Sequence, residues 1–144
     1  ILSAKKYLNQ SFIFISCDTL INDRIPKLDK NWVGFSDYGD PKKYRGIKLY
    51  KGLVENFLDK NFKKRRENKV YIGMAGINDY TTFWKEMDNN RNYSIPVGEV
   101  YGLKNISKKI YAYRFKWSDV GNFKDYEKIK KKQKSKNKKK YKKK

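Results

Sequence analysis

The stretch "KVYIGMAGINDYTTFWKEMDNN", residues 69–90, decides the fold because it places a strand directly before a helix. Its first part, residues 69–77, is nearly continuous in apolar and small residues, which is typical of a strand covered on both faces. In its second part Phe83 and Met87 lie four residues apart, on one face of a helix, and Asp79 stands where an N-cap is expected. We therefore predict a buried strand followed by a short amphipathic helix.

The segments on both sides of this unit alternate between strand and helix patterns. Apolar, β-prone runs predict strands at residues 11–16, 31–38, 44–50 and 108–115, and a turn at Lys51 and Gly52 leads into one more strand that completes a hairpin. Helical patterns occupy residues 2–9, 97–106 and 122–129, the last with Asn122 and Asp125 as its cap. This alternation predicts an α/β fold with a mixed, mostly parallel sheet, flanking helices and one antiparallel hairpin.

Basic residues dominate the charge of the chain, and many of them lie at its C-terminal end. The formal net charge is +21 over 144 residues. Residues 128–144 hold 12 of the 36 basic residues and no acid, which leaves 24 basic and 15 acidic residues, or +9, for residues 1–127. The run "KIKKKQKSKNKKKYKKK" has too few apolar residues to offset the entropy of ordering. We predict a folded domain over residues 1–127 and, over residues 128–144, a helix end that runs into a disordered tail.

The cysteine and histidine content limits the possible chemistry. Cys17 is the only cysteine, so no internal disulfide forms, and the absence of histidine excludes the usual zinc ligand sets and His-based acid/base catalysis. No apolar run approaches the ~20 residues that span a bilayer, and the opening "ILSAKKYLNQ" lacks a signal pattern. We expect a cytoplasmic protein with no membrane partner, whose chemistry depends on carboxylates, amines or a bound metal.

Two aspartates follow apolar strands and are candidates for a ligand site. Asp18 comes after "SFIFISC", and Asp119 comes after "IYAYRFKWS", two residues before Gly121. In open α/β sheets ligands bind beyond the carboxyl ends of the strands. Mg²⁺ takes oxygen ligands and commonly only one or two carboxylates, with water and substrate phosphate completing its shell. Aspartates at strand ends are also ordinary turn formers and helix caps, and the pattern leaves that alternative open.

Five segments, taken in order, resemble the motifs of the sugar-phosphate nucleotidyltransferases, the GT-A-like enzymes that make NDP-sugars. They are "FIFISCDTLI", "VENFLDK", "YIGMAGI", "VGEVYGL" and "WSDVGNFKDY", and the resemblance covers most of residues 8–129. It implies that Asp18, Asp119 and Lys60 are catalytic, with Asp18 and Asp119 binding Mg²⁺ and Lys60 contacting the sugar phosphate. It also implies that Glu99 contacts sugar hydroxyls in a pocket lined by Gly73. The substrates implied are a sugar 1-phosphate and a nucleoside triphosphate, which fits precursor supply for a polysaccharide or another glycan.

One motif of that family has no counterpart in this sequence. Family members open with a glycine-rich loop, followed by an arginine and a lysine, whose backbone N–H groups cradle the nucleotide phosphates. The resemblance therefore implies that residues 1–127 correspond to the C-terminal portion of the catalytic domain, and that these 144 residues alone catalyse no nucleotidyl transfer. Cys17 stands where the family more often has a small residue.

The same residues are also compatible with other interpretations. Lys60 is also compatible with a solvated surface lysine, Glu99 with a glutamate that complements a helix dipole, and Gly73 with a packing glycine. The basic, tyrosine-rich composition is compatible with a nucleic-acid or polyanion-binding module, and the Lys-rich tail with non-specific polyanion binding. A non-catalytic remnant of the enzyme family is the third alternative. The sequence predicts neither the base, nor the sugar, nor an oligomeric state.

Overall fold

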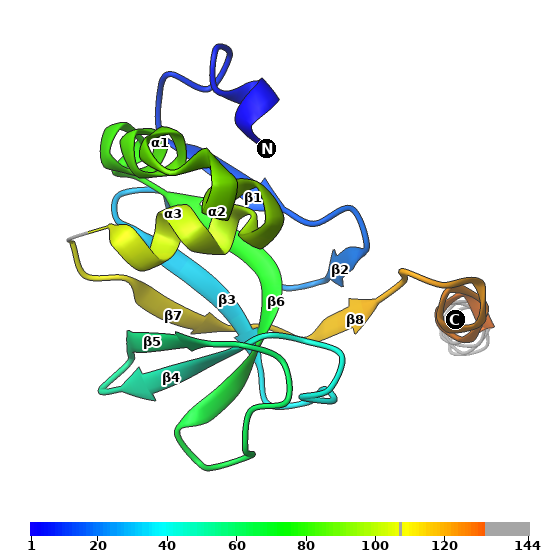
Figure 1. The fold of residues 1–144 in the computed structure, drawn as a ribbon. Helices are drawn as coiled ribbons and strands as arrows, with labels where there is room; N and C mark the ends of the chain where they lie inside the picture. The colour runs from blue at the N-terminus through cyan, green and yellow to red at the C-terminus, as the bar shows by residue number, and fades with distance from the viewer. Residues whose placement is uncertain (107, 132–144) are drawn as a thin grey trace.

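The computed structural model describes residues 1–106 and 108–131, and its centre is a closed five-stranded barrel (Figure 1). The strands are β1 (Phe12–Ile15), β2 (Thr19–Ile21), β3 (Trp32–Ser36), β4 (Gly46–Tyr50), β5 (Leu53–Leu58), β6 (Asn68–Ile77), β7 (Tyr111–Arg114) and β8 (Trp117–Asp119). The helices are α1 (Tyr80–Asn89), α2 (Arg91–Val97) and α3 (Glu99–Asn105), with a 3-10 turn at Leu2–Ala4. The chain is thus a mixed α/β protein.

Strand β6 organises the barrel because it pairs with three other strands. Its last four residues pair with β1, the part from Val70 to Gly76 pairs with β3, and its beginning pairs with β4. The order β6, β3, β7, β5, β4 then closes back on β6. As the sequence predicted, β6 is a buried strand: seven of its ten residues are buried. The hairpin of β4 and β5 is also confirmed, with Lys51 (φ 48°) and Gly52 (φ 80°) in the left-handed conformation that a tight turn requires.

The prediction of a mostly parallel sheet is wrong. Among the described strands only β3 and β7 pair in parallel, and all other pairings are antiparallel. Parallel neighbours need a long crossover, whereas antiparallel neighbours can be joined by short loops. The helices α1 to α3 form one continuous block between β6 and β7 instead of being distributed between the strands. One helical block cannot supply the repeated crossovers of a parallel sheet.

Helices α1 to α3 cover one side of the barrel and enclose the larger part of the core. Phe83 and Met87 of α1 and Leu103 of α3 are completely buried there, together with apolar residues of the strands. The predicted N-cap is confirmed, because the Asp79 carboxylate accepts a hydrogen bond from the Thr82 N–H (3.4 Å). Helix α2 was not predicted, and it carries Pro96 in its interior, which argues against a helix in a sequence.

A small two-stranded sheet, also not predicted, stands beside the barrel. Its strands β2 and β8 pair antiparallel, with Thr19 opposite Asp119 and Ile21 opposite Trp117. Both strands have only three residues, which is too short for an alternating pattern to be recognised in the sequence. This sheet joins the segments that carry the two candidate aspartates.

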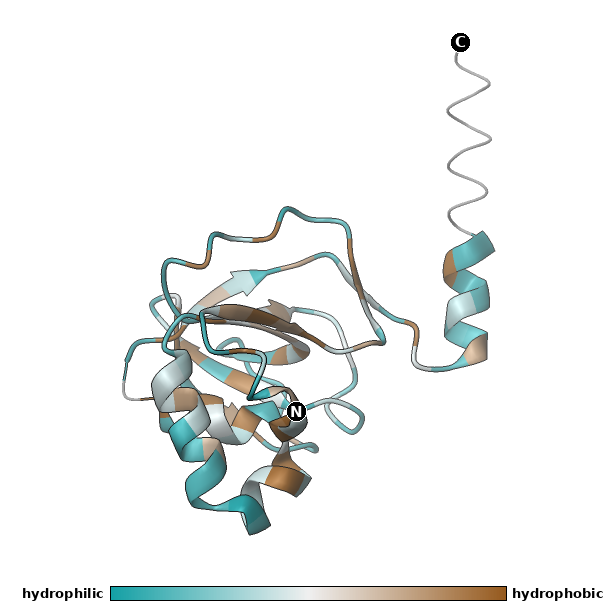
Figure 2. Cartoon of the chain, turned by 90° about the horizontal axis from the view of Figure 1, so that it is seen from above, coloured by the Kyte–Doolittle hydropathy of each residue, from teal (hydrophilic) through white to brown (hydrophobic). Residues whose placement is uncertain are grey.

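After β8 the chain turns at Gly121, and residues 123–131 are helical. The predicted cap is confirmed, since the Asn122 side chain accepts a hydrogen bond from the Asp125 N–H (3.0 Å). Figure 2 shows this segment standing apart from the barrel. The predicted disordered tail lies largely outside the described residues. No helix in the described ranges is both long and apolar enough to cross a membrane.

Candidate functional site

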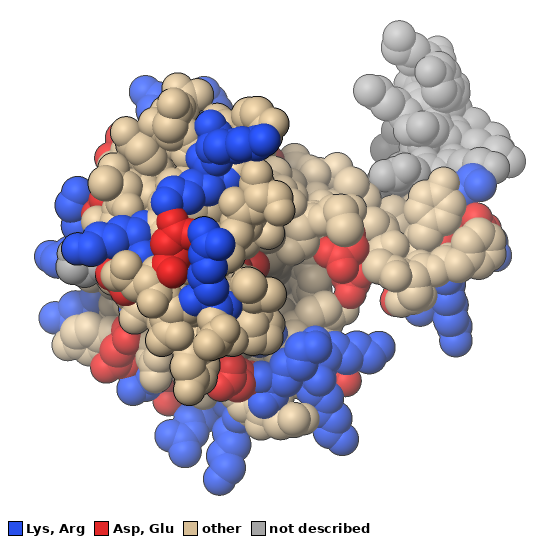
Figure 3. All heavy atoms as spheres, turned by 45° about the horizontal axis from the view of Figure 1, so that its top comes forward, with Lys and Arg blue, Asp and Glu red and all other residues tan. Residues whose placement is uncertain are grey.

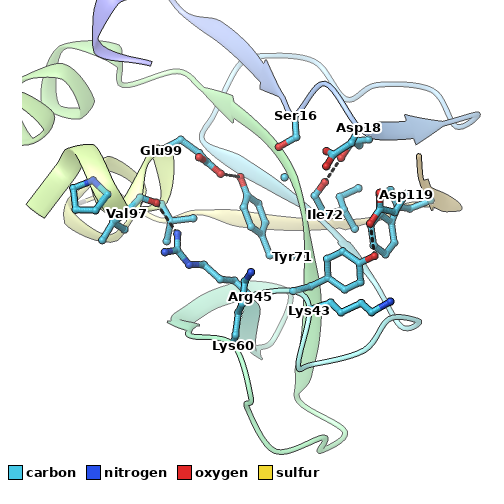
Figure 4. Close-up of a pocket in the computed structure, with 16 residues that line it drawn as sticks. Ser16, Asp18, Lys43, Arg45, Lys60, Tyr71, Ile72, Val97, Glu99 and Asp119 are labelled. Carbon is cyan, nitrogen blue, oxygen red and sulfur yellow. Dashed lines mark hydrogen bonds between the residues drawn. The ribbon is translucent and has the colours of Figure 1, made fainter. Parts of the chain in front are cut away.

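A pocket of about 320 Å³ opens between the small sheet, the middle of β6 and the first turn of α3 (Figure 4). This volume is at the lower end of the range typical of small-molecule sites. Asp18 and Asp119 lie on one side, toward which Lys43 extends, and Arg45 and Lys60 lie on another. The lining residues that bear on the chemistry are Ser16, Asp18, Thr19, Lys43, Tyr44, Arg45, Lys60, Tyr71, Gly73, Glu99, Trp117 and Asp119.

The turn that carries Asp18 is fixed on both sides by hydrogen bonds. The Ser16 N–H donates to the carbonyl of Gly73 (2.8 Å), and the Thr19 hydroxyl donates to the carbonyl of Ile72 (2.5 Å). The turn is thereby held against the middle of β6. The Val120 N–H donates to the Asp18 carbonyl (2.9 Å), which ties the same turn to the end of β8.

The carboxylates of Asp18 and Asp119 converge beside Gly121. A methyl group placed on Gly121 would lie 3.0 Å from Oδ1 of Asp119 and 3.1 Å from Oδ2 of Asp18. The missing side chain of this glycine therefore leaves a space that both carboxylates border. Two like charges this close repel one another unless a cation lies nearby. Asp18 takes part in no ion pair with the described residues, and neither does Asp119.

The orientation of Asp119 is fixed by two donors that leave its remaining lone pairs available. The Tyr44 hydroxyl donates to Oδ2, and the Gly121 N–H donates to Oδ1 (2.7 Å). Tyr44 is itself held by edge-on packing against Trp117, with ring centroids 4.9 Å apart. Burial, followed by the hydrogen bond to Asp119, raises the pKa of Tyr44 well above its ordinary value, so the phenol stays protonated and remains a donor.

This pair of carboxylates fits a divalent cation such as Mg²⁺. The described residues contain no group of three or more His, Cys, Asp or Glu side chains that would enclose a metal. Mg²⁺ does not require such a cage, because it commonly binds one or two carboxylates and completes its shell with water and substrate phosphate. Hydrogen bonds that orient a ligating carboxylate, as those to Asp119 do, are a regular feature of metal sites.

Lys43, Arg45 and Lys60 bring positive charge to the pocket. The Arg45 guanidinium donates to the carbonyl of Val97 at the end of α2 (2.6 Å), and its Nε lies 3.9 Å from the Asp59 carboxylate. Lys43 and Lys60 have no ion-pair partner within the part of the chain that the structure describes. Arg45 is half-buried and anchored, whereas the two lysines are exposed. The three side chains form a site suited to an anion such as a phosphate.

Glu99 closes the pocket at the first turn of α3 and is linked to β6. Its carboxylate accepts a hydrogen bond from the Tyr71 hydroxyl (3.2 Å). Burial raises the pKa of Glu99 above its ordinary value, although the hydrogen bonds to the carboxylate and the charge of Arg45 oppose this shift. Burial next to Glu99 also raises the pKa of Tyr71. The result is a partly buried acceptor of hydrogen bonds that faces a small-molecule pocket.

Gly73 lines the pocket and is also required by the packing. Its φ of +67° is a conformation that other residues rarely adopt, and a methyl group there would collide with the Ser16 hydroxyl. Its position is therefore compatible both with a residue that lines the pocket and with a packing glycine. Its lack of a side chain brings the Asp18 turn close to β6.

The structure brings all five predicted site residues to one pocket, and four more that the sequence did not indicate. The predicted ones are Asp18, Lys60, Gly73, Glu99 and Asp119, and the additional ones are Lys43, Tyr44, Arg45 and Tyr71. The segment that contains Tyr44 and Arg45 was interpreted only as a strand, which in fact begins at Gly46. Nothing in their local sequence distinguishes these residues from others in so basic and tyrosine-rich a chain. Their roles follow from contacts between segments far apart in sequence.

Comparison with solved structures identifies the fold. The chain is similar to a candidate glucose-1-phosphate thymidylyltransferase from Bacillus anthracis in complex with a sucrose (TM-score 0.64, 12% identity, 88% of this chain and 56% of that chain). It is also similar to the inositol-1-phosphate CTP transferase from T. maritima (TM-score 0.60, 10% identity, 86% and 55%). A mannose-1-phosphate geranyltransferase from Thermus thermophilus matches as well (TM-score 0.51, 14% identity, 85% and 50%).

These matches confirm, at the level of the fold, the similarity to sugar-phosphate nucleotidyltransferases that the motifs indicated. All three proteins are named for a 1-phosphate of a sugar or inositol. The chain spans about half the length of each of them. No protein-family model matches the chain, and a search of curated proteins gives no match.

Proposed function

We propose that this chain supplies the metal and sugar-1-phosphate side of a sugar-1-phosphate nucleotidyltransferase site. The observation that carries the proposal is the convergence of Asp18 and Asp119 beside Gly121, in one pocket with Lys43, Arg45 and Lys60. A pocket that combines a pair of carboxylates with several cations suits a phosphorylated substrate that binds together with a divalent cation. The shared fold supports the same reaction class.

The reaction would join a sugar 1-phosphate to the nucleotidyl group of a nucleoside triphosphate. An oxygen of the sugar phosphate attacks the α-phosphorus, the bond between that phosphorus and the oxygen bridging to the β-phosphate breaks, and pyrophosphate leaves with the electron pair. The attacking oxygen is already ionised at neutral pH, so no side chain has to act as nucleophile or base. A chain without histidine is therefore compatible with this chemistry.

Asp18 and Asp119 would hold Mg²⁺ through their carboxylate oxygens. Bound there, Mg²⁺ would neutralise charge on the phosphates and align them. Tyr44 acts as a positioning residue, because its hydroxyl fixes one oxygen of Asp119 and its high pKa keeps that donor in place. The Gly121 N–H fixes the other oxygen. Both contacts reduce the reorganisation that the carboxylate needs when it binds a cation.

Arg45 and Lys60 would bind the phosphate of the sugar substrate, and Lys43 would add positive charge at the rim. Arg45 already donates to the Val97 carbonyl, which fixes the direction of its guanidinium. Glu99, held by Tyr71, would accept hydrogen bonds from sugar hydroxyls. An acceptor left unpaired by a wrong sugar costs about 1–3 kcal/mol, which is enough to contribute to the choice of sugar.

The proposal is tested by the binding of Mn²⁺, in place of Mg²⁺, to the 144-residue chain, measured by electron paramagnetic resonance. Asp18→Asn and Asp119→Asn should each weaken binding by at least about tenfold, because losing even an outer contact of a metal site costs roughly 10–100-fold. Gly121→Ala should weaken it too, since the added methyl group would lie about 3 Å from both carboxylates. Asp29→Asn removes the same charge from an exposed position outside the pocket and serves as the matched control.

The second part of the experiment follows the sugar phosphate by ³¹P NMR, with glucose, mannose and inositol 1-phosphates as probes. Bound Mn²⁺ should broaden the phosphorus signal of at least one of them, and Lys60→Gln should remove the broadening while leaving Mn²⁺ binding intact. Mn²⁺ binding that is the same in Asp18→Asn, Asp119→Asn and Asp29→Asn would contradict the metal assignment. Mn²⁺ binding without any effect on the three phosphates would contradict the substrate assignment.

A further inference from the structure

Two adjacent loops beside the pocket carry a concentration of exposed cations, here called the basic loop surface. The loop between β3 and β4 contributes Lys42 and Lys43, and the loop between β5 and β6 contributes Lys60, Lys63, Lys64, Arg65 and Arg66. All seven side chains are exposed, and none forms an ion pair with a described residue. Figure 3 shows Lys and Arg side chains crowded along the lower edge of the molecule.

The acidic residues in these loops do not cancel this charge. Asp37 is already paired with Lys69 (2.6 Å) and Arg114 (2.7 Å). Asp40 accepts a hydrogen bond from the Lys42 N–H (3.0 Å) and so stabilises the turn. Asp59 lies near Arg45, and Glu67 is the remaining acid. The basic loop surface therefore keeps a clear excess of positive charge.

The basic side chains do not hold the loops in place. The Asn61 N–H donates to the carbonyl of Pro41 (2.7 Å), which joins the two loops. The ring of Phe62 packs on Gly46, where an added methyl group would lie only 2.7 Å from it. The Asn68 side chain donates to the carbonyl of Lys63 (2.9 Å), and backbone bonds complete the turn. Since the backbone and Phe62 fix the loops, the seven cations contribute little to folding and are available to a partner.

An exposed aromatic ring stands in the β3–β4 loop, which also carries Lys42 and Lys43. The side chain of Tyr38 is 76% exposed, and its N–H is fixed by the Ser36 hydroxyl (3.1 Å). Tyr38 borders a groove of about 380 Å³ that Lys43 and Lys128 line together with the carboxylates of Asp40, Asp119 and Asp125. A ring in this position can stack on a nucleic-acid base while neighbouring lysines contact the phosphates.

We propose that the basic loop surface binds single-stranded nucleic acid, with phosphates along the two loops and a base stacked on Tyr38. Charge complementarity favours a polyanion, and the exposed ring favours one that carries bases. An anionic membrane is the less favoured partner, because the apolar side chain within the basic run, Phe62, packs on Gly46 instead of projecting outward. This function does not depend on the proposed transferase site, although Lys43, Lys60 and the groove residues Tyr44 and Asp119 border both.

The test compares two charge-matched variants of the full chain. Lys63, Lys64, Arg65 and Arg66 are changed to Gln in the loop variant, and the exposed residues Lys6, Lys85, Lys104 and Lys109, which lie outside the loops, are changed to Gln in the control variant. Both variants lose four positive charges and keep the same residues 132–144. Neither set includes a residue assigned to the transferase site.

Binding to a fluorescein-labelled 20-nucleotide oligouridylate is measured by fluorescence anisotropy between 50 and 300 mM KCl. The dissociation constant of the loop variant at 100 mM KCl should rise by roughly tenfold or more, and its salt slope should fall by about 2 to 3, since each phosphate contact on a single strand contributes about 0.7. The control variant should change by less than about threefold, because it removes no phosphate contact.

A second pair of variants tests the stacking role of Tyr38. Tyr38→Ala should weaken binding by about fivefold or more without changing the salt slope, because stacking on a base is not a charge interaction. Tyr50→Ala removes another exposed ring, 61% exposed, at the turn of the β4–β5 hairpin, and should have no effect. Tyr38→Phe should bind as the wild type does. These variants keep the proposal testable if the quadruple loop variant does not fold, which circular dichroism establishes.

Three results would overturn the proposal. The first is equal weakening by the loop and control variants, which would mean that binding follows total charge alone. The second is no binding of the oligonucleotide to the wild-type chain at 100 mM KCl. The third is loss of binding to vesicles of 70% phosphatidylcholine and 30% phosphatidylserine in the loop variant while oligonucleotide binding is unchanged, which would make a membrane the partner. None of these results bears on Mn²⁺ or sugar-phosphate binding, so the two proposals fail separately.

Discussion

Helices α1 to α3, here called the helical layer, and the walls of the pocket differ in whether their polar side chains have partners within the protein. In the helical layer the Ser94 hydroxyl donates to the Met87 carbonyl (2.6 Å), and the Trp84 indole donates to the Leu8 carbonyl (2.8 Å). In the pocket Asp18, Lys43 and Lys60 have no ion-pair partner among the described residues. The first region stabilises the fold, whereas the second keeps charges available for a ligand at some cost in stability.

The largest expected change in the free energy of unfolding comes from a substitution in the helical layer. Phe83 is completely buried and packs edge-on against Phe12 (5.7 Å) and Trp84 (4.9 Å). Phe83→Ala should lower the free energy of unfolding by about 3–5 kcal/mol because it leaves a cavity in the core. Asp119→Asn should leave it unchanged or raise it, since it removes one of two adjacent like charges without changing volume. Urea denaturation measures the free energy of unfolding of both variants, and a clear loss in Asp119→Asn would contradict the prediction.

The second prediction concerns the glycine that joins the pocket to the barrel. Gly73→Ala should lower the free energy of unfolding by roughly 1–3 kcal/mol, because the residue has a left-handed conformation and the new methyl group would meet Ser16. Gly52→Ala is the matched control: its φ is also positive (+80°), but nothing lies within 4 Å of the added carbon. The difference between the two variants in urea isolates the steric part. Equal losses would show that only the backbone conformation matters at Gly73.

The third prediction tests the helical layer through its cap. Burial opposes ionisation of Asp79, but hydrogen bonds from Thr82 and Lys108 outweigh it and lower the pKa of this carboxyl. Asp79→Ala should therefore cost about 1 kcal/mol at neutral pH, and Asp79→Asn, which keeps a capping oxygen, should cost less. The loss should shrink as the pH falls below the ordinary value of 3.8, where the wild-type carboxyl becomes protonated. A loss that is independent of pH would exclude a contribution from the charge.

The elements of this fold were predictable where their pattern is long and local. The buried strand at residues 69–77, the cap at Asp79 and the turn at Lys51 and Gly52 depend on neighbours in sequence, and the structure has all of them. Strand direction was not predictable, because it depends on which strands meet in the barrel. A parallel sheet was predicted because strands and helices were expected to alternate along the chain. In the structure, α1 to α3 instead follow one another between β6 and β7.

The candidate site was predictable to the extent that its residues lie in recognisable motifs. Asp18 and Asp119 were found in this way, and the structure adds that Gly121 leaves the space between them. The roles of Tyr44 and Arg45 depend on partners 75 and 52 residues away, Asp119 and Val97. Such contacts are created by folding of the β3–β4 loop against the small sheet and the end of α2, and no local pattern encodes them.

The smallest expected effect concerns Glu99, a pocket residue whose charge is unfavourable for folding. Burial raises the pKa of its carboxyl above the ordinary value of 4.5, so the folded chain binds this proton more tightly than the unfolded chain. The stability from the protonated carboxyl is fully present below pH 4.5 and is lost as the pH rises through the folded pKa.

Glu99→Gln lacks this titration and keeps an oxygen to accept the Tyr71 hydrogen bond. Its melting temperature should therefore exceed that of the wild type by more at pH 7.5 than at pH 4, measured by differential scanning calorimetry. A gap that is equal at both pH values, or larger at pH 4, would mean that Tyr71 and Arg45 fully compensate the burial of this charge, and the contrast between the pocket and the helical layer would not extend to Glu99.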